Sequence, residues 1–307
     1  MGCKEKQVPK FLLVFIEWAG MTRKKEMIKL LKVKILAENH AYRRGLFAEH
    51  GLSMLIEIDG FTILFDTGQT SVFVHNARQD GIDFRTVDAV VLSHGHYDHT
   101  GGVPMFCELN TDALIYVHPQ AFQERFNSSD GKLSGSNIGI PWSPDQMDKL
   151  KGRIITQQKP LQIHKNVILS GEVARTAHFE DVSQNFLLRS SDNGLIEDRV
   201  VDEQFLAVKG SRGIYIFVGC SHPGIINCIK HALSLFPGER VVAIVGGMHL
   251  KNAEDARIQA TIQHFVELGI EQIAPLHCTG FTATCEMKRI LKDRVILLAC
   301  GDEYLEQ

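Results

Sequence analysis

Residues 93–102 read Ser93-His94-Gly95-His96-Tyr97-Asp98-His99-Thr100-Gly101-Gly102 and follow an apolar run, residues 87–92, that predicts a buried strand. His94, His96, Asp98 and His99 carry side chains that bind zinc, and also iron or manganese. Alternate positions of an extended segment point the same way, so His94 and His96 can share one ion, while Asp98 and His99 face a second after the chain turns. A solvated loop would explain one isolated histidine. Four such side chains within six residues indicate a metal centre.

Three later histidines are also placed for metal binding, because each follows an apolar run that predicts a strand. They are His222 in Gly219-Cys220-Ser221-His222, His249 in Gly246-Gly247-Met248-His249, and His277 in Pro275-Leu276-His277-Cys278-Thr279-Gly280. Functional side chains are concentrated on loops that follow rigid elements. We therefore expect the downstream ligands among these three.

The order of predicted elements indicates an α+β fold. Residues 52–58 and 61–65 alternate around Asp59-Gly60, which predicts a β-hairpin, and residues 205–208 and 214–218 predict a second one. Helices are expected late in each half, for example at 253–268, and a final strand at 295–299. Two sheets packed face to face with helices outside, an αββα four-layer sandwich, fit this order.

Two segments do not fit this order of predicted strands and helices. Residues 127–144 are rich in Ser, Gly, Asn and Pro and predict a long loop, within a loop-rich insertion around 127–165 that we expect to contribute to substrate selection. Residues 1–26 contain basic residues and a short apolar run that Glu17 interrupts, too short to span a bilayer. We expect a poorly ordered N-terminal extension there, with a helical anchor as the less favoured alternative, and a single catalytic domain over 27–307.

Composition excludes several classes of partner. The 307 residues carry a formal net charge of −3, which gives no broad attraction to nucleic acid or to an anionic membrane. Seven cysteines, an odd number without a CxxC pair, indicate neither a disulfide framework nor a cysteine-rich zinc knuckle. A reducing cytoplasm is the expected location.

Residues 93–102, which we call the metal loop, contain His94, His96, Asp98 and His99 in a pattern that resembles the HxHxDH motif of the metallo-β-lactamase superfamily. Asp66 in Phe65-Asp66-Thr67-Gly68 resembles the upstream acidic motif of that superfamily. The resemblance implies that Asp66 orients the metal loop without binding metal. It also implies that His222 joins His94 and His96 on one ion, that His277 joins Asp98 and His99 on the other, and that Asp98 and His222 take part in catalysis. Cys220 stands where many superfamily hydrolases have a bridging aspartate, and Ser170-Gly171-Glu172 stands in the region of an intermediate histidine, so Cys220, Glu172 and His249 are additional candidate ligands.

From about residue 36 to the C-terminus the chain resembles one branch of that superfamily, the 7,8-dihydropterin-6-methyl-4-(β-D-ribofuranosyl)aminobenzene 5′-phosphate synthase-like proteins. The segments that carry this resemblance are Leu46-Phe47-Ala48-Glu49-His50-Gly51-Leu52-Ser53, Ile63-Leu64-Phe65-Asp66-Thr67-Gly68, Ser170-Gly171-Glu172-Val173, Val218-Gly219-Cys220-Ser221-His222, Gly246-Gly247-Met248-His249-Leu250 and Leu276-His277-Cys278-Thr279-Gly280. It implies a synthase that displaces a diphosphate with an aminobenzene ribofuranosyl phosphate.

Two other functions remain open at this point. One is a hydrolase of a phosphorylated or ester-type small molecule that uses metal-bound hydroxide; the other is a non-catalytic or diiron redox member of the fold. The expected cofactor is one or two divalent ions, zinc first, with iron, manganese or magnesium as alternatives. We expect His50, Arg175 and His178 to bind a phosphorylated small-molecule substrate, and a homo-oligomer because small metabolic enzymes often are symmetric.

Overall fold

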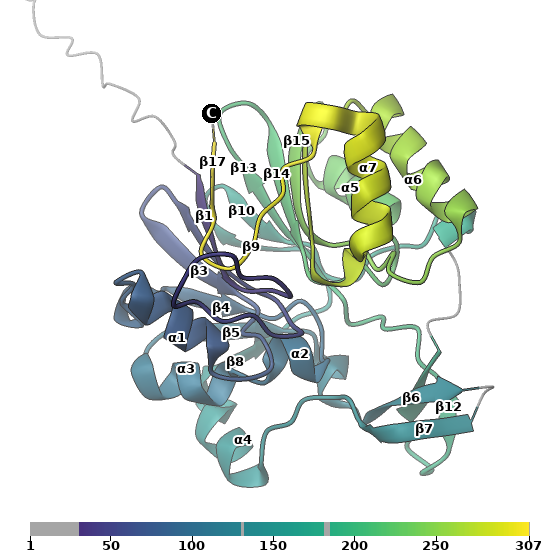
Figure 1. Ribbon diagram of the computed structural model, residues 1–307. Helices are drawn as coiled ribbons and strands as arrows, with labels where there is room; N and C mark the ends of the chain where they lie inside the picture. The colour runs from purple at the N-terminus through teal and green to yellow at the C-terminus, as the bar shows by residue number, and fades with distance from the viewer. Residues whose placement is uncertain (1–30, 130–131, 181–184, 307) are drawn as a thin grey trace, which may run out of the picture.

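Two β-sheets face each other at the centre of the molecule (Figure 1). The computed structural model describes residues 31–129, 132–180 and 185–306. In spatial order, the seven-stranded sheet contains β17 (Glu303–Leu305), β1 (Lys32–Ala37), β2 (Ser53–Ile58), β3 (Phe61–Phe65), β4 (Ala89–Val91), β5 (Leu114–Val117) and β8 (Ile154–Thr156). The six-stranded sheet contains β16 (Gln272–Leu276), β15 (Val241–Gly247), β14 (Ile214–Val218), β13 (Leu206–Lys209), β10 (Val167–Leu169) and β9 (Leu161–His164).

Three apolar layers hold these sheets and their helices together. Between the sheets, side chains such as Val33 and Phe65 pack against Tyr215 and Phe217 from the opposite sheet. The outer face of the six-stranded sheet is covered by α5 (Ile225–Leu235), α6 (Asp255–Glu267) and α7 (Phe281–Leu291). The outer face of the seven-stranded sheet packs against α1 (Val72–Gln79), α3 (Val103–Leu109) and α4 (Pro144–Leu150). The predicted αββα sandwich is therefore confirmed.

Short helices complete the layers and carry several of the candidate site residues. They are α2 (Tyr97–Thr100) and the 3₁₀ turns η1 (Phe84–Thr86), η2 (Pro119–Phe122), η3 (Lys151–Arg153), η4 (His178–Glu180), η5 (His277–Thr279) and η6 (Lys292–Arg294). The predicted hairpin at Asp59-Gly60 is confirmed as β2–β3, with Ile58 paired to Phe61. Both turn residues have positive φ, 52° and 80°, as the tight turns between twisted strands require.

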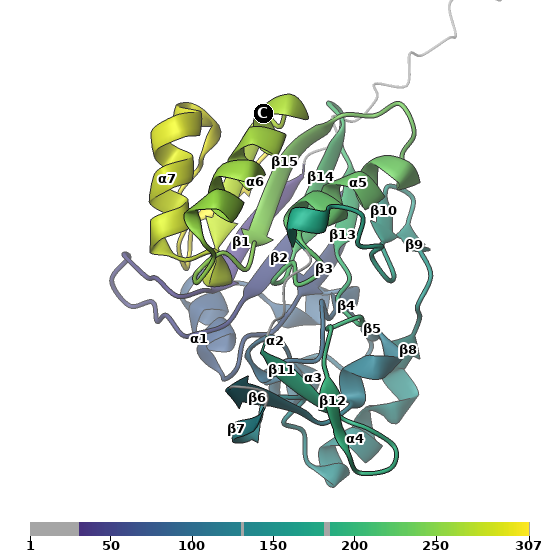
Figure 2. The ribbon, with the colours of Figure 1, turned by 90° about the vertical axis from the view of Figure 1, so that its right-hand side faces the viewer.

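The long loop predicted at residues 127–144 is wrong. The chain there forms β6 (Arg125–Ser129) and β7 (Lys132–Asn137), which join β11 (Phe186–Arg189) and β12 (Leu195–Glu197) in a third sheet of order β12-β11-β6-β7. We call it the small sheet; it stands beside the seven-stranded sheet, below α5 and α6 in Figure 2. That residues 127–165 are an insertion stays a prediction, and the predicted extension at 1–26 lies outside the described residues.

The strand predicted at 295–299 is also wrong. Only an isolated bridge joins Val295 to Ile273, and the last strand is β17, at the edge of the seven-stranded sheet. Its apolar side chains favour a strand, but Leu297 is 60% exposed, and Ile296 and Leu298 only pack against the core between the sheets.

A buried ionic cluster ties the small sheet to the metal loop. Arg125, at the start of β6 and 1% exposed, donates a hydrogen bond of 2.7 Å to Asp202 and lies 3.5 Å from Asp198. The other carboxylate oxygen of Asp202 accepts the N–H of Gly95 at 2.8 Å. Because a Cβ at Gly95 would lie 2.2 Å from the carbonyl oxygen of Ala121, only glycine fits this point of the loop.

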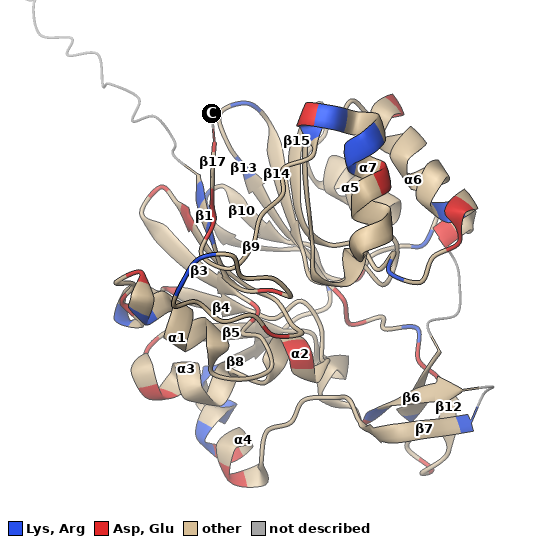
Figure 3. Ribbon diagram, viewed as in Figure 1, with Lys and Arg blue, Asp and Glu red and all other residues tan. Residues whose placement is uncertain are grey.

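No helix in the described ranges is long and apolar enough to cross a lipid bilayer. Lysines and arginines are interspersed with acidic residues over the face seen in Figure 3. That mixture agrees with the small net charge of the chain.

Candidate metal centre

A cavity of about 730 Å³ opens where the loops after β4, β14, β15 and β16 meet. Because β14, β15 and β16 run parallel, their carboxyl ends lie at one edge, and each contributes a histidine to the cavity: His222, His249 and His277. Across from them lie His96 and Asp98 of the metal loop. Residues far apart in sequence are thus brought into one site by the sandwich itself.

His94, His96 and His222 form the first group of candidate ligands. One ring nitrogen from each lies within 4.8 Å of the others, and Nε2 of His94 is 2.9 Å from Nδ1 of His96. All three are buried, and burial is the main reason that their pKa values fall, that of His96 to about 3. The rings are therefore neutral at physiological pH, which is the form of imidazole that binds metal.

Asp98 is the centre of the second group. Its Oδ2 lies 3.3 Å from Nε2 of His277, 3.9 Å from Nε2 of His99 and 3.2 Å from Nε2 of His50. Burial alone would raise the pKa of Asp98, yet the surrounding histidines, His99 foremost, lower it well below its usual value. The structure thus groups Asp98 with His277 and with His50, which we predicted as a substrate-binding residue, while His99 lies slightly farther from Asp98. That Asp98, His99 and His277 share one ion stays a prediction.

Asp66 anchors the metal loop from beneath. Its carboxylate accepts the backbone N–H and the hydroxyl of Ser93, both at 2.7 Å, and contacts Nδ1 of His99 at 2.7 Å. Burial disfavours the charged ring of His99, but the carboxylates of Asp66 and Asp98 outweigh it and raise its pKa to about 9. A hydrogen bond from Nδ1 to Asp66 leaves Nε2 facing the centre. This geometry supports the predicted orienting role of Asp66.

We predict that Asp66→Asn weakens metal binding without abolishing the fold. The amide keeps one acceptor oxygen but loses the charge that holds His99 and Ser93, and such orienting partners commonly contribute about 10- to 100-fold to metal affinity. Competitive titration with a chromophoric chelator measures the change. Asp88→Asn serves as the control. Asp88 directly precedes β4, and its carboxylate accepts the N–H of Thr62 and none from the metal loop. Equal metal affinity in Asp66→Asn and wild type would contradict the orienting role.

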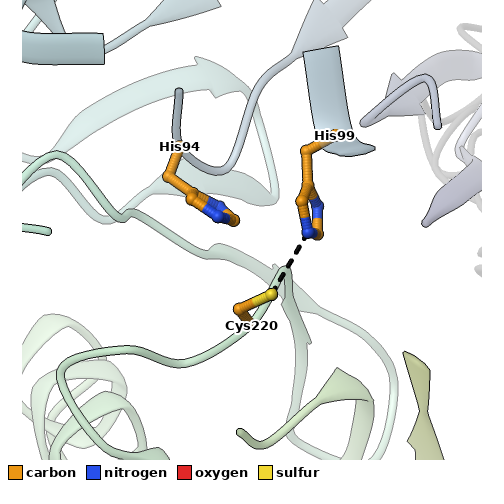
Figure 4. A group of neighbouring side chains, drawn as sticks. All are labelled: His94, His99 and Cys220. Atoms are coloured by element: carbon orange, nitrogen blue, oxygen red, sulfur yellow. Dashed lines mark hydrogen bonds between the residues drawn. The ribbon is translucent and has the colours of Figure 1, made fainter. Parts of the chain in front are cut away.

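Cys220 lies between the two groups. Figure 4 shows its sulfur pointing toward the rings of His94 and His99, with Nε2 of His99 3.1 Å from the sulfur. These three residues offer ligand atoms within 4.8 Å of one another. Cys220 is 4% exposed, so its thiol is enclosed by the site.

Glu203 shapes the loop that carries Cys220 and His222, and sequence reasoning missed it. Its buried carboxylate accepts three successive backbone N–H groups, from Cys220 at 2.8 Å and from Ser221 and His222 at 2.5 Å. Burial raises the pKa of Glu203 to about 7, against the opposing effect of the three donors. The only signal in the sequence is the polar run Asp202-Glu203-Gln204 directly before a strand, which is weak.

The other predicted residues are placed as follows. His249 lines the cavity and forms a possible ligand group with Cys220 and His222. Glu172 is half-exposed, pairs with His118 at 3.1 Å, and is not in any ligand group of the described residues. Arg175 donates hydrogen bonds to the carbonyl oxygens of His222 and Arg199, and neither it nor His178 lines the cavity, so their binding to substrate stays a prediction.

The donor set fits divalent metal ions. Neutral imidazole, carboxylate and thiol side chains are zinc ligands, and two neutral rings stand with nitrogens 2.9 Å apart. Nε2 of His96 is buried and has no hydrogen-bond partner within the described part of the chain. A buried polar atom normally has a bonding partner, and a metal ion bound at Nε2 of His96 would supply it.

Comparison with known proteins agrees with this geometry. A family model described as the metallo-beta-lactamase superfamily matches residues 47–158. The chain is 32% identical over 262 residues to the 7,8-dihydropterin-6-methyl-4-(beta-D-ribofuranosyl)-aminobenzene-5′-phosphate synthase of Methanocaldococcus jannaschii, covering 82% of this chain and 89% of the relative.

Solved structures show the same fold. Tm1679, described as a metal-dependent hydrolase of the beta-lactamase superfamily, is 28% identical with a TM-score of 0.75, over 89% of this chain and 98% of that one. YhfI from Bacillus subtilis, a metallo-beta-lactamase fold protein, is 14% identical with a TM-score of 0.56, over 91% and 100% of the two chains. The chain therefore belongs to the metallo-β-lactamase superfamily, in the branch that contains the M. jannaschii synthase.

Proposed function

We propose that this enzyme joins a (7,8-dihydropterin-6-yl)methyl group to an aminobenzene ribofuranosyl phosphate with departure of diphosphate. The observation that carries the proposal is that two groups of candidate metal ligands, His94-His96-His222 and His50-Asp98-His277, both have members that line one cavity of about 730 Å³. A cavity of that size is in the range that encloses a drug-sized ligand. The synthase of M. jannaschii, 32% identical to this chain, supplies the reaction class.

The candidate ligands in and next to the cavity would hold two ions. His94, His96 and His222 would hold one ion, and Asp98, His99 and His277 a second; zinc is the expected metal. Divalent ions supply stabilisation of negative charge on a departing diphosphate, or acidify a water molecule. Asn39 orients His277, because its side-chain oxygen lies 3.1 Å from Nδ1 of that ring and its amide donates to the carbonyl oxygen of His277 at 3.3 Å.

Lys251 and Arg257 offer positive charge to the phosphorylated part of the substrate. Both line the cavity: Lys251 lies on the segment between β15 and α6, and Arg257 lies in the first turn of α6. Nε of Arg257 is buried and makes no hydrogen bond to another described residue, and burial lowers the pKa of its guanidinium. An anion bound there would gain charge-assisted hydrogen bonds in partly dry surroundings.

We predict that Arg257→Ala raises KM for the phosphorylated substrate by about 10- to 100-fold, the equivalent of one lost hydrogen bond to a charged group. kcat should change much less, because Arg257 is expected to act in binding. Steady-state kinetics at varied substrate concentration measures both. Arg289→Ala, on the exposed face of α7 and paired with Glu286, is the control. An unchanged KM in Arg257→Ala would remove Arg257 from the binding site.

The experiment that tests the function is a coupling assay with zinc-loaded protein and the two substrates of the reaction, the dihydropterin methyl diphosphate and the aminobenzene ribofuranosyl phosphate. Formation of the coupled product with release of diphosphate supports the synthase. Cleavage of either phosphorylated compound by water, without coupling, supports the alternative of a hydrolase, which the 28% identity to the hydrolase Tm1679 favours. His96→Ala, which removes a ligand of the proposed centre, should lose more than about 100-fold of whichever activity wild type shows.

A further inference from the structure

Two thiols lie together at the edge of the metal centre. Cys220 follows β14, and Cys278 follows β16 in η5; they are 4% and 8% exposed. The sulfur of Cys278 is 3.6 Å from the carbonyl oxygen of Cys220 and accepts the backbone N–H of His249 at 3.3 Å. Cys278 also lines the cavity, so a bound ion can reach its sulfur.

The spacing of these thiols suits a common ion. The sulfurs of Cys220 and Cys278 and a ring nitrogen of His277 all lie within 4.8 Å of one another. With zinc–ligand bonds of about 2.0–2.3 Å, ligand atoms that share one ion lie about 3–4.5 Å apart. Side-chain adjustments of about one ångström would bring the three atoms onto one ion.

Gly247 keeps the space that the sulfur needs. A Cβ at this position would lie 2.6 Å from the sulfur of Cys278 and 2.4 Å from the carbonyl oxygen of Gly219. Any other residue would therefore push the Cys278 side chain out of its place beside Cys220. The glycine at the end of β15 is consistent with a sulfur that must stay at the centre.

We propose that Cys278 is a metal ligand that, together with Cys220, gives sulfur donors to the ion held by His277. The assignment rests on the proposed metal centre, and it adds a preference of that centre for one class of metal ion. Thiolates are soft ligands that favour zinc or iron, whereas magnesium and manganese prefer oxygen. The centre therefore selects a thiophilic ion, and magnesium does not replace it.

X-ray absorption at the zinc edge, on fully zinc-loaded protein, tests the proposal directly. Wild type should show zinc–sulfur scattering at about 2.3 Å from two sulfurs. Cys278→Ser and Cys220→Ser should each lose about half of it, and the double variant all of it. Cys228→Ser is the matched control, because Cys228 is another buried thiol, in α5, that packs in the apolar core. A Cys278→Ser spectrum identical to that of wild type would overturn the proposal.

A second measurement uses the unaltered protein. Alkylation of each cysteine with iodoacetamide is followed by mass spectrometry with zinc bound and after chelation, with Cys228 as internal reference. Zinc should slow labelling of Cys278 at least about 10-fold while leaving Cys228 unchanged. Equal labelling of Cys278 in both states, or a Cys220–Cys278 disulfide in the zinc-loaded protein, would refute the assignment.

Elemental analysis of the same samples separates this inference from the proposed function. Wild type that binds zinc with no sulfur from Cys278 refutes the inference alone and leaves the metalloenzyme intact. Wild type that binds no metal after reconstitution refutes both.

Discussion

Replacing His96 with alanine is expected to remove about one of two equivalents of bound metal and to lower activity by more than about 100-fold. His96 is one of three buried, neutral imidazoles whose nitrogens meet within 4.8 Å, and two remaining rings hold an ion poorly. Residues that only orient a ligand already contribute about 10- to 100-fold, so loss of a ligand should exceed that range. Elemental analysis of protein purified without added metal gives the stoichiometry.

His164→Ala is the control for that experiment. His164 is a half-buried histidine that stacks on Phe61, in β9 at the edge of the six-stranded sheet and away from the cavity. It should keep the full metal content and activity. If His96→Ala retains the metal content of wild type, the first group of ligands is wrongly assigned.

Replacing Glu203 with alanine is expected to lower the free energy of unfolding of the metal-free protein by about 3–5 kcal/mol. Three buried N–H groups lose their acceptor at once, and each unsatisfied group costs about 1–3 kcal/mol before water or a shift of the loop compensates. Urea unfolding of the metal-free variants gives the change. Glu203→Gln keeps one acceptor oxygen, so its free energy of unfolding should lie between those of wild type and Glu203→Ala.

Glu254→Ala provides the comparison, since Glu254 is an exposed glutamate that precedes α6. It should change stability by less than about 0.5 kcal/mol. If Glu203→Ala loses no more stability than Glu254→Ala, the loop that carries Cys220 and His222 keeps its shape without the carboxylate of Glu203.

The sequence predicted what depends on neighbours along the chain. The metal loop could be singled out because its four candidate ligands fall within six residues, and the β2–β3 hairpin because Asp59-Gly60 stands between alternating strands. The later histidines, His222 and His277, were found because each follows a buried parallel strand, and parallel strands end at one edge.

The small sheet escaped prediction for a physical reason. All residues of β7, Lys132–Asn137, are exposed, and its sequence KLSGSN has neither alternation nor β-branched side chains. The strand exists because β6 pairs with it and because β6 in turn pairs with β11, about 60 residues later in the chain. The dipeptide Asp130-Gly131 between β6 and β7 is a local hairpin signal, but the pairing of β6 with β11 leaves no local pattern.

Supporting residues of the site were missed for a similar reason. Glu203 acts on backbone N–H groups that are 17–19 residues away, and any loop has such groups, so no motif announces the contact. His50 and Asn39 reach the second group of ligands from the loop between β1 and β2. Because both residues lie more than 40 residues before the metal loop, no local pattern connects His50 with Asp98 or Asn39 with His277.

The link from Arg125 through Asp202 to Gly95 constrains any redesign of this enzyme for other substrates. Phe186 and Asn127 of the small sheet line the cavity and are natural positions for randomised libraries. Exchanging the whole sheet for one from a related protein would also remove Arg125, leaving the buried carboxylate of Asp202 without its counter-charge beside the metal loop. Successful chimaeras should retain this arginine, whatever else is replaced around it.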